Sequence, residues 1–547
     1  MSSLQIGTRL GGRQAPRRES LLSLRFGRLE AAATLVSLLY AGLAWYLVGA
    51  LGLTSPEAVA RTVRVGAMWD GFEPSVVGFG FDRPPLLTAL AAPFGSVEAL
   101  RGHGLTAAVT TAATGGFSVI VAGALARHAG LTRPATVLFV LAFALNPLLV
   151  YAGVFGLPEA LYTALMLVAL WQFGEWVERR NVASVVMVGF AIGVAFLLRY
   201  NVVLIALVVG WAFWWVARQD ERETRQEEAA RATALAFMVP VVFVAGLWTL
   251  LAWFPRGEFL GYLREASALS RLGGEDLAVI QRTADLRWNV LGTMRWVGGW
   301  ALLVAPASAV AVAGLAAYGL YEGRRGQVAL ALVSASVLLP EAMAVFTGHG
   351  QAHVPHLFVA AAPVFAIFAY RERRRTRGVR PSAYERPRRR AQVAGAGGLL
   401  LASLASAVVL LLMPVSDPPA VALEETVRTG VAPAAVSEDV LRMADFIRAE
   451  AGRGDVLADV QRHALLMLTV GDLDRFHTPA STADEAALYE SFEAARYILV
   501  RRPLHGQGEG RIEQAYEDAF AGSASSLSLA FEAGDYRLYA VMRPAIP

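Results

Sequence analysis

The sequence predicts an all-α polytopic membrane domain of about eleven transmembrane helices, followed by a small α/β domain at the C-terminus. The first observation behind this prediction is composition: 55% of the 547 residues are hydrophobic and 17% are charged, with a mean hydropathy of +0.46. A soluble chain of this length would carry more charge on its surface. The second is patterning, because long uncharged runs alternate with short arginine-rich segments, as in chains that cross a bilayer repeatedly.

Each predicted span is an apolar run of roughly 17–25 residues or a somewhat shorter one, which is compatible with a re-entrant or merged helix. These runs lie at residues 31–53, 105–126, 135–152, 159–177, 183–198, 202–216, 233–254, 297–320, 328–346, 357–370 and 393–413. A basic arm at residues 1–30 precedes the first run, and it shows no cleavable signal pattern.

Arginines mark one end of the predicted spans. Beyond the basic arm they occur at Arg127, Arg133, Arg179, Arg180, Arg324 and Arg325, and within residues 218–231 and 371–390. If every span crosses, all of these lie on one side, which the positive-inside rule makes cytoplasmic. We therefore expect a multi-pass protein of the cytoplasmic (inner) membrane with a cytoplasmic N-terminus. Loops 54–104 and 255–295 of a membrane domain at 31–413, and the segment 414–547, then lie outside.

The segment 414–547 is expected to form the α/β domain. Its apolar patterns predict helices at 437–451, 484–494 and 511–520, strands at 455–460 and 496–500, and a hairpin of strands 527–531 and 536–542. The turn of that hairpin is predicted at Ala533-Gly534-Asp535. About 130 residues can hold one small core.

Composition also excludes some classes of function. The chain has no cysteine, which rules out disulfides, thiolate nucleophiles and cysteine-ligated metals. Its net charge of +4 does not indicate a nucleic-acid partner, because the arginines flank apolar spans and are expected to face membrane lipids.

Carboxylates beside the predicted spans are the strongest candidates for chemistry, because ionisable groups are costly to desolvate there. The first outer loop holds several, at Glu57, Asp70, Glu73 and Asp82. The last of them opens Asp82-Arg83-Pro84-Pro85-Leu86, where the two prolines favour an extended backbone leading into the next apolar stretch. Further along the chain, Glu159 opens a span after Pro158.

The order of these elements resembles the membrane glycosyltransferases of the GT-C fold, in the branch that contains protein O-mannosyltransferases and lipid A aminoarabinose transferases. The resemblance rests on an acidic outer loop ending in Arg83-Pro84-Pro85-Leu86, on Leu157-Pro158-Glu159, on Gly193 to Asn201, and on His353-Val354-Pro355-His356. It spans residues 31–363, and no single motif in it is specific. One departure is that the acidic pair usual after the first span is here Ser55-Pro56-Glu57.

The resemblance implies transfer of a sugar from a polyprenyl-phosphate donor to a glycan, lipid or protein acceptor at the outer membrane face. The catalytic base would be Glu57 or Asp70, which the sequence does not separate. Substrate-binding residues would be Asp82, Arg83, Glu159, Arg199, Tyr200, His353 and His356. No cofactor is required by these residues, and a divalent cation is left open.

Simpler interpretations stand beside these. Glu57 and Glu159 suit the first turn of a helix, Asp82 and Arg83 suit a local ion pair, and Arg199 suits a snorkelling side chain. The histidines suit either an exposed loop or metal ligands. The alternative functions are a non-catalytic or diverged GT-C-like subunit of an envelope assembly complex, or a transporter of lipid-linked precursors. A transporter would be expected to show internal repeats, and the sequence shows none.

Overall fold

A computed structural model describes residues 27–72, 84–218, 226–256, 259–260, 286–347, 359–377, 385–412, 418–432, 436–478, 495–502, 512 and 527–542. Five candidate residues, Glu73, Asp82, Arg83, His353 and His356, lie outside these ranges. The predicted helix at 484–494 also lies outside them, and of the one at 511–520 only Ile512 is described.

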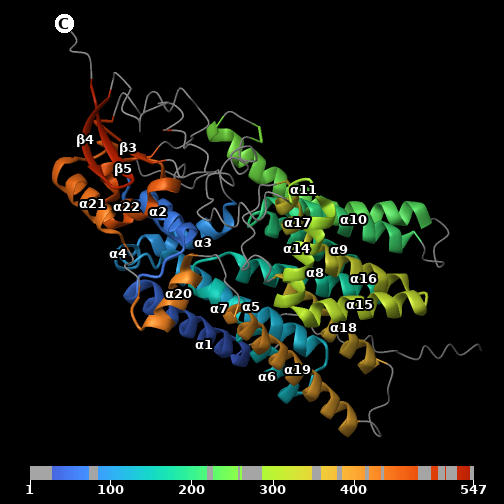
Figure 1. Cartoon of the computed structure of the whole chain (residues 1–547). Helices are drawn as coiled ribbons and strands as arrows, with labels where there is room; N and C mark the ends of the chain where they lie inside the picture. The colour runs from blue at the N-terminus through green and yellow to red at the C-terminus, as the bar shows by residue number, and fades with distance from the viewer. Residues whose placement is uncertain are drawn as a thin grey trace, which may run out of the picture.

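Up to residue 412, the regular secondary structure of the described residues is helical (Figure 1). The long ones in the first half are α1 (Gly27–Ala44), continued by η2 (Trp45–Ala50), α5 (Thr106–His128), α8 (Glu159–Arg179), α9 (Val182–Phe196), α10 (Val203–Ala217) and α11 (Gln226–Arg256). Between α5 and α8 lie α6 (Arg133–Ala144) and α7 (Pro147–Val154). The second half has α14 (Val290–Val304), α15 (Pro306–Tyr321), α16 (Arg325–Ser336), α17 (Leu339–Thr347), α18 (Ala362–Arg377) and α19 (Glu385–Leu412).

Every predicted span coincides with one of these helices or with a broken pair of them. By length and composition, five described helices could cross a membrane, and eight spans result if each bent pair is counted as one. The breaks precede Pro147 and Pro306 and lie near Leu339, with bends of 54°, 109° and 45°. Proline stops a helix because it lacks the backbone N–H and clashes with the preceding turn. The predicted span at 297–320 is thus divided at Pro306 into α14 and α15.

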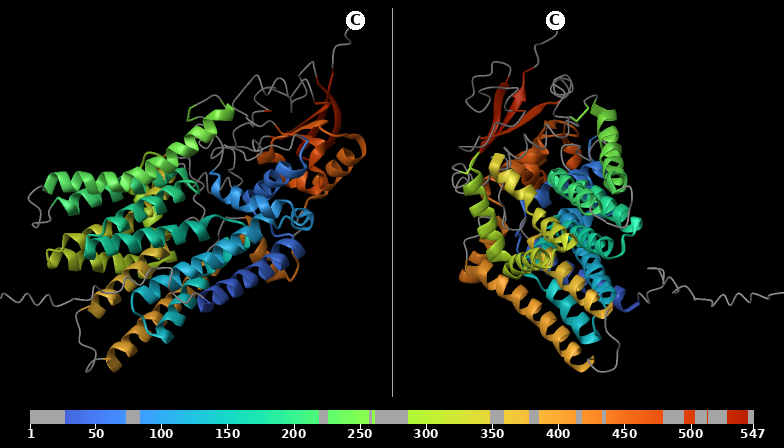
Figure 2. Two further views of the ribbon diagram at one scale, coloured as in Figure 1. Left: turned by 180° about the vertical axis from the view of Figure 1, so that it is seen from behind. Right: turned by 90° about the vertical axis from the view of Figure 1, so that its right-hand side faces the viewer.

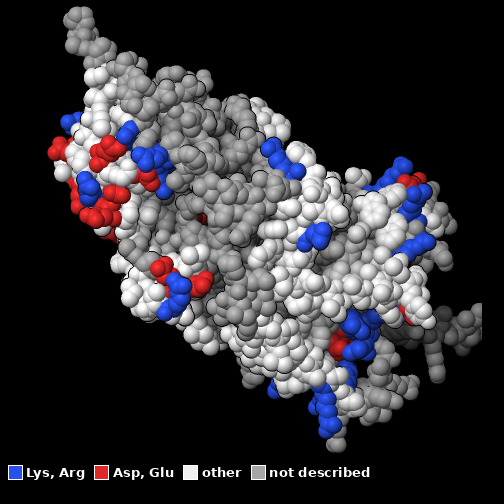
Figure 3. Space-filling model, viewed as in Figure 1, with Lys and Arg blue, Asp and Glu red and all other residues white. Residues whose placement is uncertain are grey.

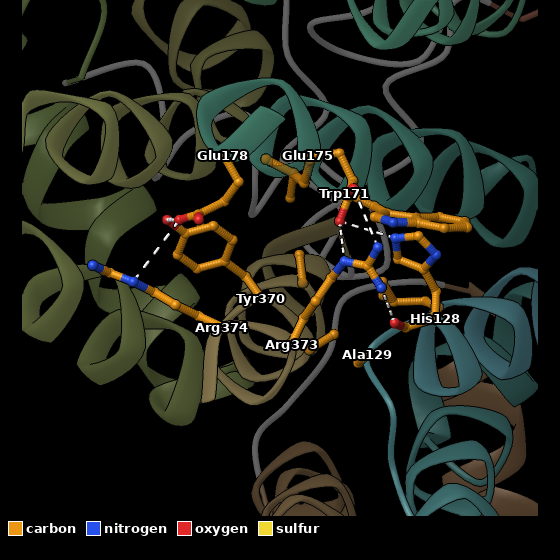
Figure 4. Close-up of a pocket in the computed structure, with 12 residues that line it drawn as sticks. His128, Ala129, Trp171, Glu175, Glu178, Tyr370, Arg373 and Arg374 are labelled. Atoms are coloured by element: carbon orange, nitrogen blue, oxygen red, sulfur yellow. Dashed lines mark hydrogen bonds and ion pairs between the residues drawn. The ribbon is translucent and has the colours of Figure 1, made fainter. Parts of the chain in front are cut away.

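The helices lie side by side in a bundle, as the two views in Figure 2 show. On the face shown in Figure 3, arginines gather at the end of the bundle that lies away from the C-terminal strands. Most of the described surface between this end and the C-terminal strands is uncharged. At this arginine-rich end, Glu175 of α8 pairs with His128 of α5 at 2.9 Å and with Arg373 of α18 (Figure 4). It also pairs with Arg179 of its own helix at 3.1 Å. This cluster joins the ends of three helices.

Short helices cover the other end of the bundle: α2 (Pro56–Asp70), α3 (Leu86–Gly95), α4 (Glu98–Gly102) and α20 (Pro418–Thr429). Beyond them lies the sheet domain, which we define as α21 (Glu438–Glu450), β1 (Val456–Leu457), α22 (Val460–Val470), η6 (Leu473–Arg475), β2 (Phe476–His477), β3 (Tyr497–Arg501), β4 (Leu527–Ala533) and β5 (Tyr536–Val541). Figure 1 shows α2 between the bundle and this domain.

The five strands of the sheet domain form one mixed sheet in the order β2-β1-β3-β5-β4. β1 pairs in parallel with β2 and β3, and β5 pairs antiparallel with β3 and β4. The predicted hairpin is confirmed, with Gly534 at a positive φ of 55° in its turn. The side chain of Ser437 caps α21 by accepting from the backbone N–H of Val440 at 3.3 Å. The fold is thus a helical membrane domain followed by a small α/β sheet domain, as predicted.

Candidate functional site

The amino-terminal turn of α2 carries the first candidate. Ser55 is the N-cap and Pro56 is the first helical residue, a position that suits proline because its missing N–H is not needed there. Glu57 follows in the first turn and pairs with Arg61 one turn later, with 2.7 Å between Oε1 and Nη2. The Glu57 side chain is 31% exposed, whereas that of Arg61 is 8% exposed. The carboxylate therefore reaches solvent from a largely buried helix.

Arg61 also ties α2 to the bundle. Its Nη1 donates to the backbone carbonyl of Gly156 at 2.5 Å, in the turn that leads into α8. Burial lowers the pKa of the Arg61 guanidinium, and the carboxylates of Glu57 and Glu159 oppose this shift. Arg64 is likewise buried on the next turn of α2.

Glu57, Arg61 and Arg64 line one pocket. It has about 360 Å³ of empty space, part of it open to solvent. The remaining lining residues are Pro84, Leu87, Thr88, Pro158 and Leu198. The pocket thus lies where α2 meets the start of α3, the start of α8 and the end of α9. Two buried cations beside one carboxylate suit an anionic group that is accompanied by a proton donor.

A second charged cluster is formed by the sequence neighbours of two residues that line this pocket. Glu159, next to Pro158, is fully buried, and its Oε1 lies 2.5 Å from Nη2 of Arg199, next to Leu198. Arg199 also pairs with Glu341 of α17. Its guanidinium lies 5.2 Å from the ring centre of Tyr162, which is one turn after Glu159 on α8. Two helices that are distant in sequence, α8 and α17, therefore converge on one buried arginine.

Glu341 was not among the predicted site residues. The signal was present, because this carboxylate interrupts the apolar run predicted as a span at 328–346. Together the two clusters hold three carboxylates (Glu57, Glu159, Glu341) and three guanidinium groups (Arg61, Arg64, Arg199). Charge is thus balanced within this set of described residues.

Asp70 lies apart from the pocket. It is the last residue of α2, thirteen positions after Glu57, or roughly 20 Å at 1.5 Å per residue. Its side chain is 56% exposed and pairs with Arg101 of α4. Tyr200 is not among the pocket residues either: its hydroxyl accepts a hydrogen bond from Nε1 of Trp248 at 3.1 Å. The two candidate bases are therefore at opposite ends of one helix.

Metal binding has no support from the described part of the chain. Within it, no group of three or more His, Asp or Glu side chains is arranged to hold a metal ion.

Comparison with known proteins gives a structural match only. No protein-family model matches the sequence, and no curated protein matches it. The crystal structure of ArnT from Cupriavidus metallidurans bound to undecaprenyl phosphate matches with a TM-score of 0.51 and 14% identity, over 94% of this chain and 98% of that one. ArnT in the apo state matches with a TM-score of 0.47, 15% identity and coverages of 93% and 98%.

An oligosaccharyltransferase of Archaeoglobus fulgidus matches with a TM-score of 0.38 and 14% identity, over 86% of this chain and 69% of that one. The match to ArnT with bound lipid shows the fold. This chain is a multi-pass membrane protein with the GT-C fold, which confirms the fold that the sequence resemblance implied.

Proposed function

We propose that this chain is a membrane glycosyltransferase, which moves a sugar from a polyprenyl-phosphate donor to a glycan, lipid or protein acceptor. The observation that supports this most is the pocket of Glu57, Arg61 and Arg64, in a chain that shares its fold with a protein crystallised with undecaprenyl phosphate. A lipid-linked donor keeps its tail in the bilayer and presents its phosphosugar at the membrane surface. The pocket lies at the bundle end where such a headgroup would be met.

Orientation follows from charge. The arginine-rich end of the bundle is expected to face the cytoplasm, because basic residues in short loops beside membrane spans are retained there. The sheet domain lies at the other end (Figures 1 and 3), and the pocket is lined by residues of α2, the helix that packs on this domain. Transfer would then take place at the outer face of the cytoplasmic membrane.

We assign the role of base to Glu57 and not to Asp70. Glu57 lines the pocket, whereas Asp70 pairs with Arg101 at the other end of α2. In the reaction, an acceptor hydroxyl or amine attacks the anomeric carbon, and the bond from that carbon to the phosphate oxygen breaks. Glu57 takes the acceptor's proton, and the polyprenyl phosphate leaves with the bonding electrons. A single displacement of this kind inverts the anomeric centre.

Arg61 and Arg64 would hold the phosphate. Charge develops on it as the sugar departs, and buried guanidinium groups stabilise such charge more strongly than water does. The cluster of Glu159, Arg199 and Glu341 would support this pocket from behind. Asp82, Arg83, Tyr200, His353 and His356 remain predicted contacts for donor or acceptor.

The test is turnover by purified protein in lipid nanodiscs, with polyprenyl-phosphate sugars and envelope acceptors. A positioned general base contributes roughly 10²–10⁴-fold to rate, so Glu57→Gln should lose about that factor. Asp70→Asn is the matched control on the same helix and should keep most activity. Loss in Asp70→Asn with retention in Glu57→Gln would reverse the assignment, and no turnover of any donor by the wild type would refute the proposed activity.

A further inference from the structure

Helix α2 is enclosed on almost every side. The nine consecutive residues from Ala58 to Gly66 are all buried, which is unusual for a helix outside the membrane. A helix repeats its faces every three to four residues, so such a run must contact partners all around. The contacts of α2 sort onto three faces.

The first face belongs to the sheet domain. Val59, Ala60 and Val63 lie in the same hydrophobic core as Met443 and Met467, on α21 and α22. Val63 is 0% exposed. The same face continues at Gly66, where a methyl group would lie 2.6 Å from Cδ1 of Leu473 in η6. These apolar residues of α2 are thus part of the sheet domain's own core.

The second face belongs to the helix bundle. Ala58 packs against Gly156, where an added methyl group would lie 2.6 Å from the Ala58 side chain. Thr62 accepts a hydrogen bond from the backbone N–H of Ala107, at the start of α5, at 3.4 Å. The third face, between the other two, carries Glu57, Arg61 and Arg64 and lines the pocket.

From this arrangement we infer that the sheet domain sets the rotation of α2 and thereby aims the Glu57 carboxylate into the pocket, with Val63 as a positioning residue. Among the described residues, the bundle contacts α2 through Ala58, Arg61 and Thr62, which lie on one side of the helix. Without the opposing contact at Val63 and Gly66, the helix can turn about its axis, and a turn of a single residue position moves a side chain by about 100°. The sheet domain then acts on the active site through α2.

The absence of cysteine from the chain makes this directly measurable. In a Glu57→Cys background, the rate of labelling by a membrane-impermeant maleimide reports how far position 57 is exposed. Adding Val63→Ala should raise that rate several-fold. The control is Val500→Ala, which removes the same atoms from an equally buried valine in the core on the other face of the sheet. It should leave the labelling rate unchanged.

A second pair of variants distinguishes rotation of α2 from unfolding. Gly66→Ala should raise the labelling rate because its methyl group displaces Leu473, and adding Leu473→Ala should restore the rate by removing the obstacle. Protease resistance of the sheet domain confirms that each variant is folded. Equal labelling in the wild-type and Val63→Ala backgrounds would overturn the inference, as would an equal rise with Val500→Ala.

The inference rests on the proposed role of Glu57, but labelling measures position without turnover. If the wild type transfers sugar, Val63→Ala should lower kcat with Glu57 present and leave the donor KM nearly unchanged, whereas Val500→Ala should alter neither. If the wild type is inactive with every donor, the proposed function fails and the labelling result still decides how α2 is held.

Discussion

Replacing Arg199 with glutamine should destabilise the protein more than replacing either carboxylate that contacts it. The Arg199 side chain is 11% exposed, and those of Glu159 and Glu341 are 0% and 7% exposed. Glu341→Gln leaves Arg199 paired with Glu159 and still able to donate to the new amide. Arg199→Gln instead leaves two buried carboxylates close together without the cation that they share.

The magnitudes follow from this difference. Removing one partner of a buried ion pair costs roughly 3–5 kcal/mol, and Arg199→Gln should lie at the top of that range because two carboxylates lose their partner. Glu341→Gln weakens one charge-assisted hydrogen bond and should cost about 1–3 kcal/mol. The double variant should cost less than the sum by about 0.5–3 kcal/mol, since neutralising Glu341 relieves part of the repulsion.

Reversible unfolding in mixed micelles, followed by tryptophan fluorescence, measures these differences. Arg218→Gln is the matched control, because Arg218 is 55% exposed and pairs with an exposed Glu227 at 3.1 Å. Exposed pairs of this kind contribute about 0–1 kcal/mol. Additive costs in the double variant, or a cost for Arg199→Gln no larger than that for Glu341→Gln, would refute the idea that one arginine neutralises both carboxylates.

Two further predictions concern stability. Gly116→Ala should weaken the packing of α1 on α5, because the added methyl group would lie 2.6 Å from the backbone carbonyl oxygen of Ala33. Gly397→Ala is the control, because its methyl group would meet nothing within 4 Å. Thermal unfolding should show a lower melting temperature for the first variant and an unchanged one for the second. Burial lowers the pKa of His463, in the sheet domain, from 6.5 to about 3. Between these two pH values the imidazole of His463 binds a proton in the unfolded chain but not in the folded domain. The stability that the neutral, buried His463 contributes is therefore complete above pH 6.5 and is lost as pH falls from there toward 3. His463→Gln should flatten this part of the pH dependence of the melting temperature, and an unchanged slope would contradict the assignment.

Spans and the hairpin were predictable because both depend on local patterns. Apolar runs identify bilayer helices, and Gly534 between two alternating segments identifies a turn. The 109° bend at Pro306 was harder, because a proline inside an apolar run is compatible with either a kinked span or two helices. Only the packing around the break distinguishes them.

Within the candidate site, individual residues were predictable from the sequence, but the contacts between them were not. Glu57, Glu159 and Arg199 were predicted as site residues because charged side chains beside apolar runs are rare. Glu57 and Asp70 remained equally good candidates for the base, since both lie on the predicted loop 54–104. Their separation along α2 is evident only once that part of the loop is known to be helical. The pairing of Arg199 with Glu341 is a contact between segments distant in sequence, which no local pattern encodes.

The place of α2 in two cores also constrains how the protein is made. Ribosomes produce α2 early, directly after the first span, and they produce α21 and α22, whose residues share a core with Val59 and Val63, only after the last helix of the bundle. During the interval of synthesis and membrane insertion, those valines lack these partners. A polypeptide that terminates early would keep this apolar face of α2 exposed, and quality-control proteases could recognise incomplete molecules by it.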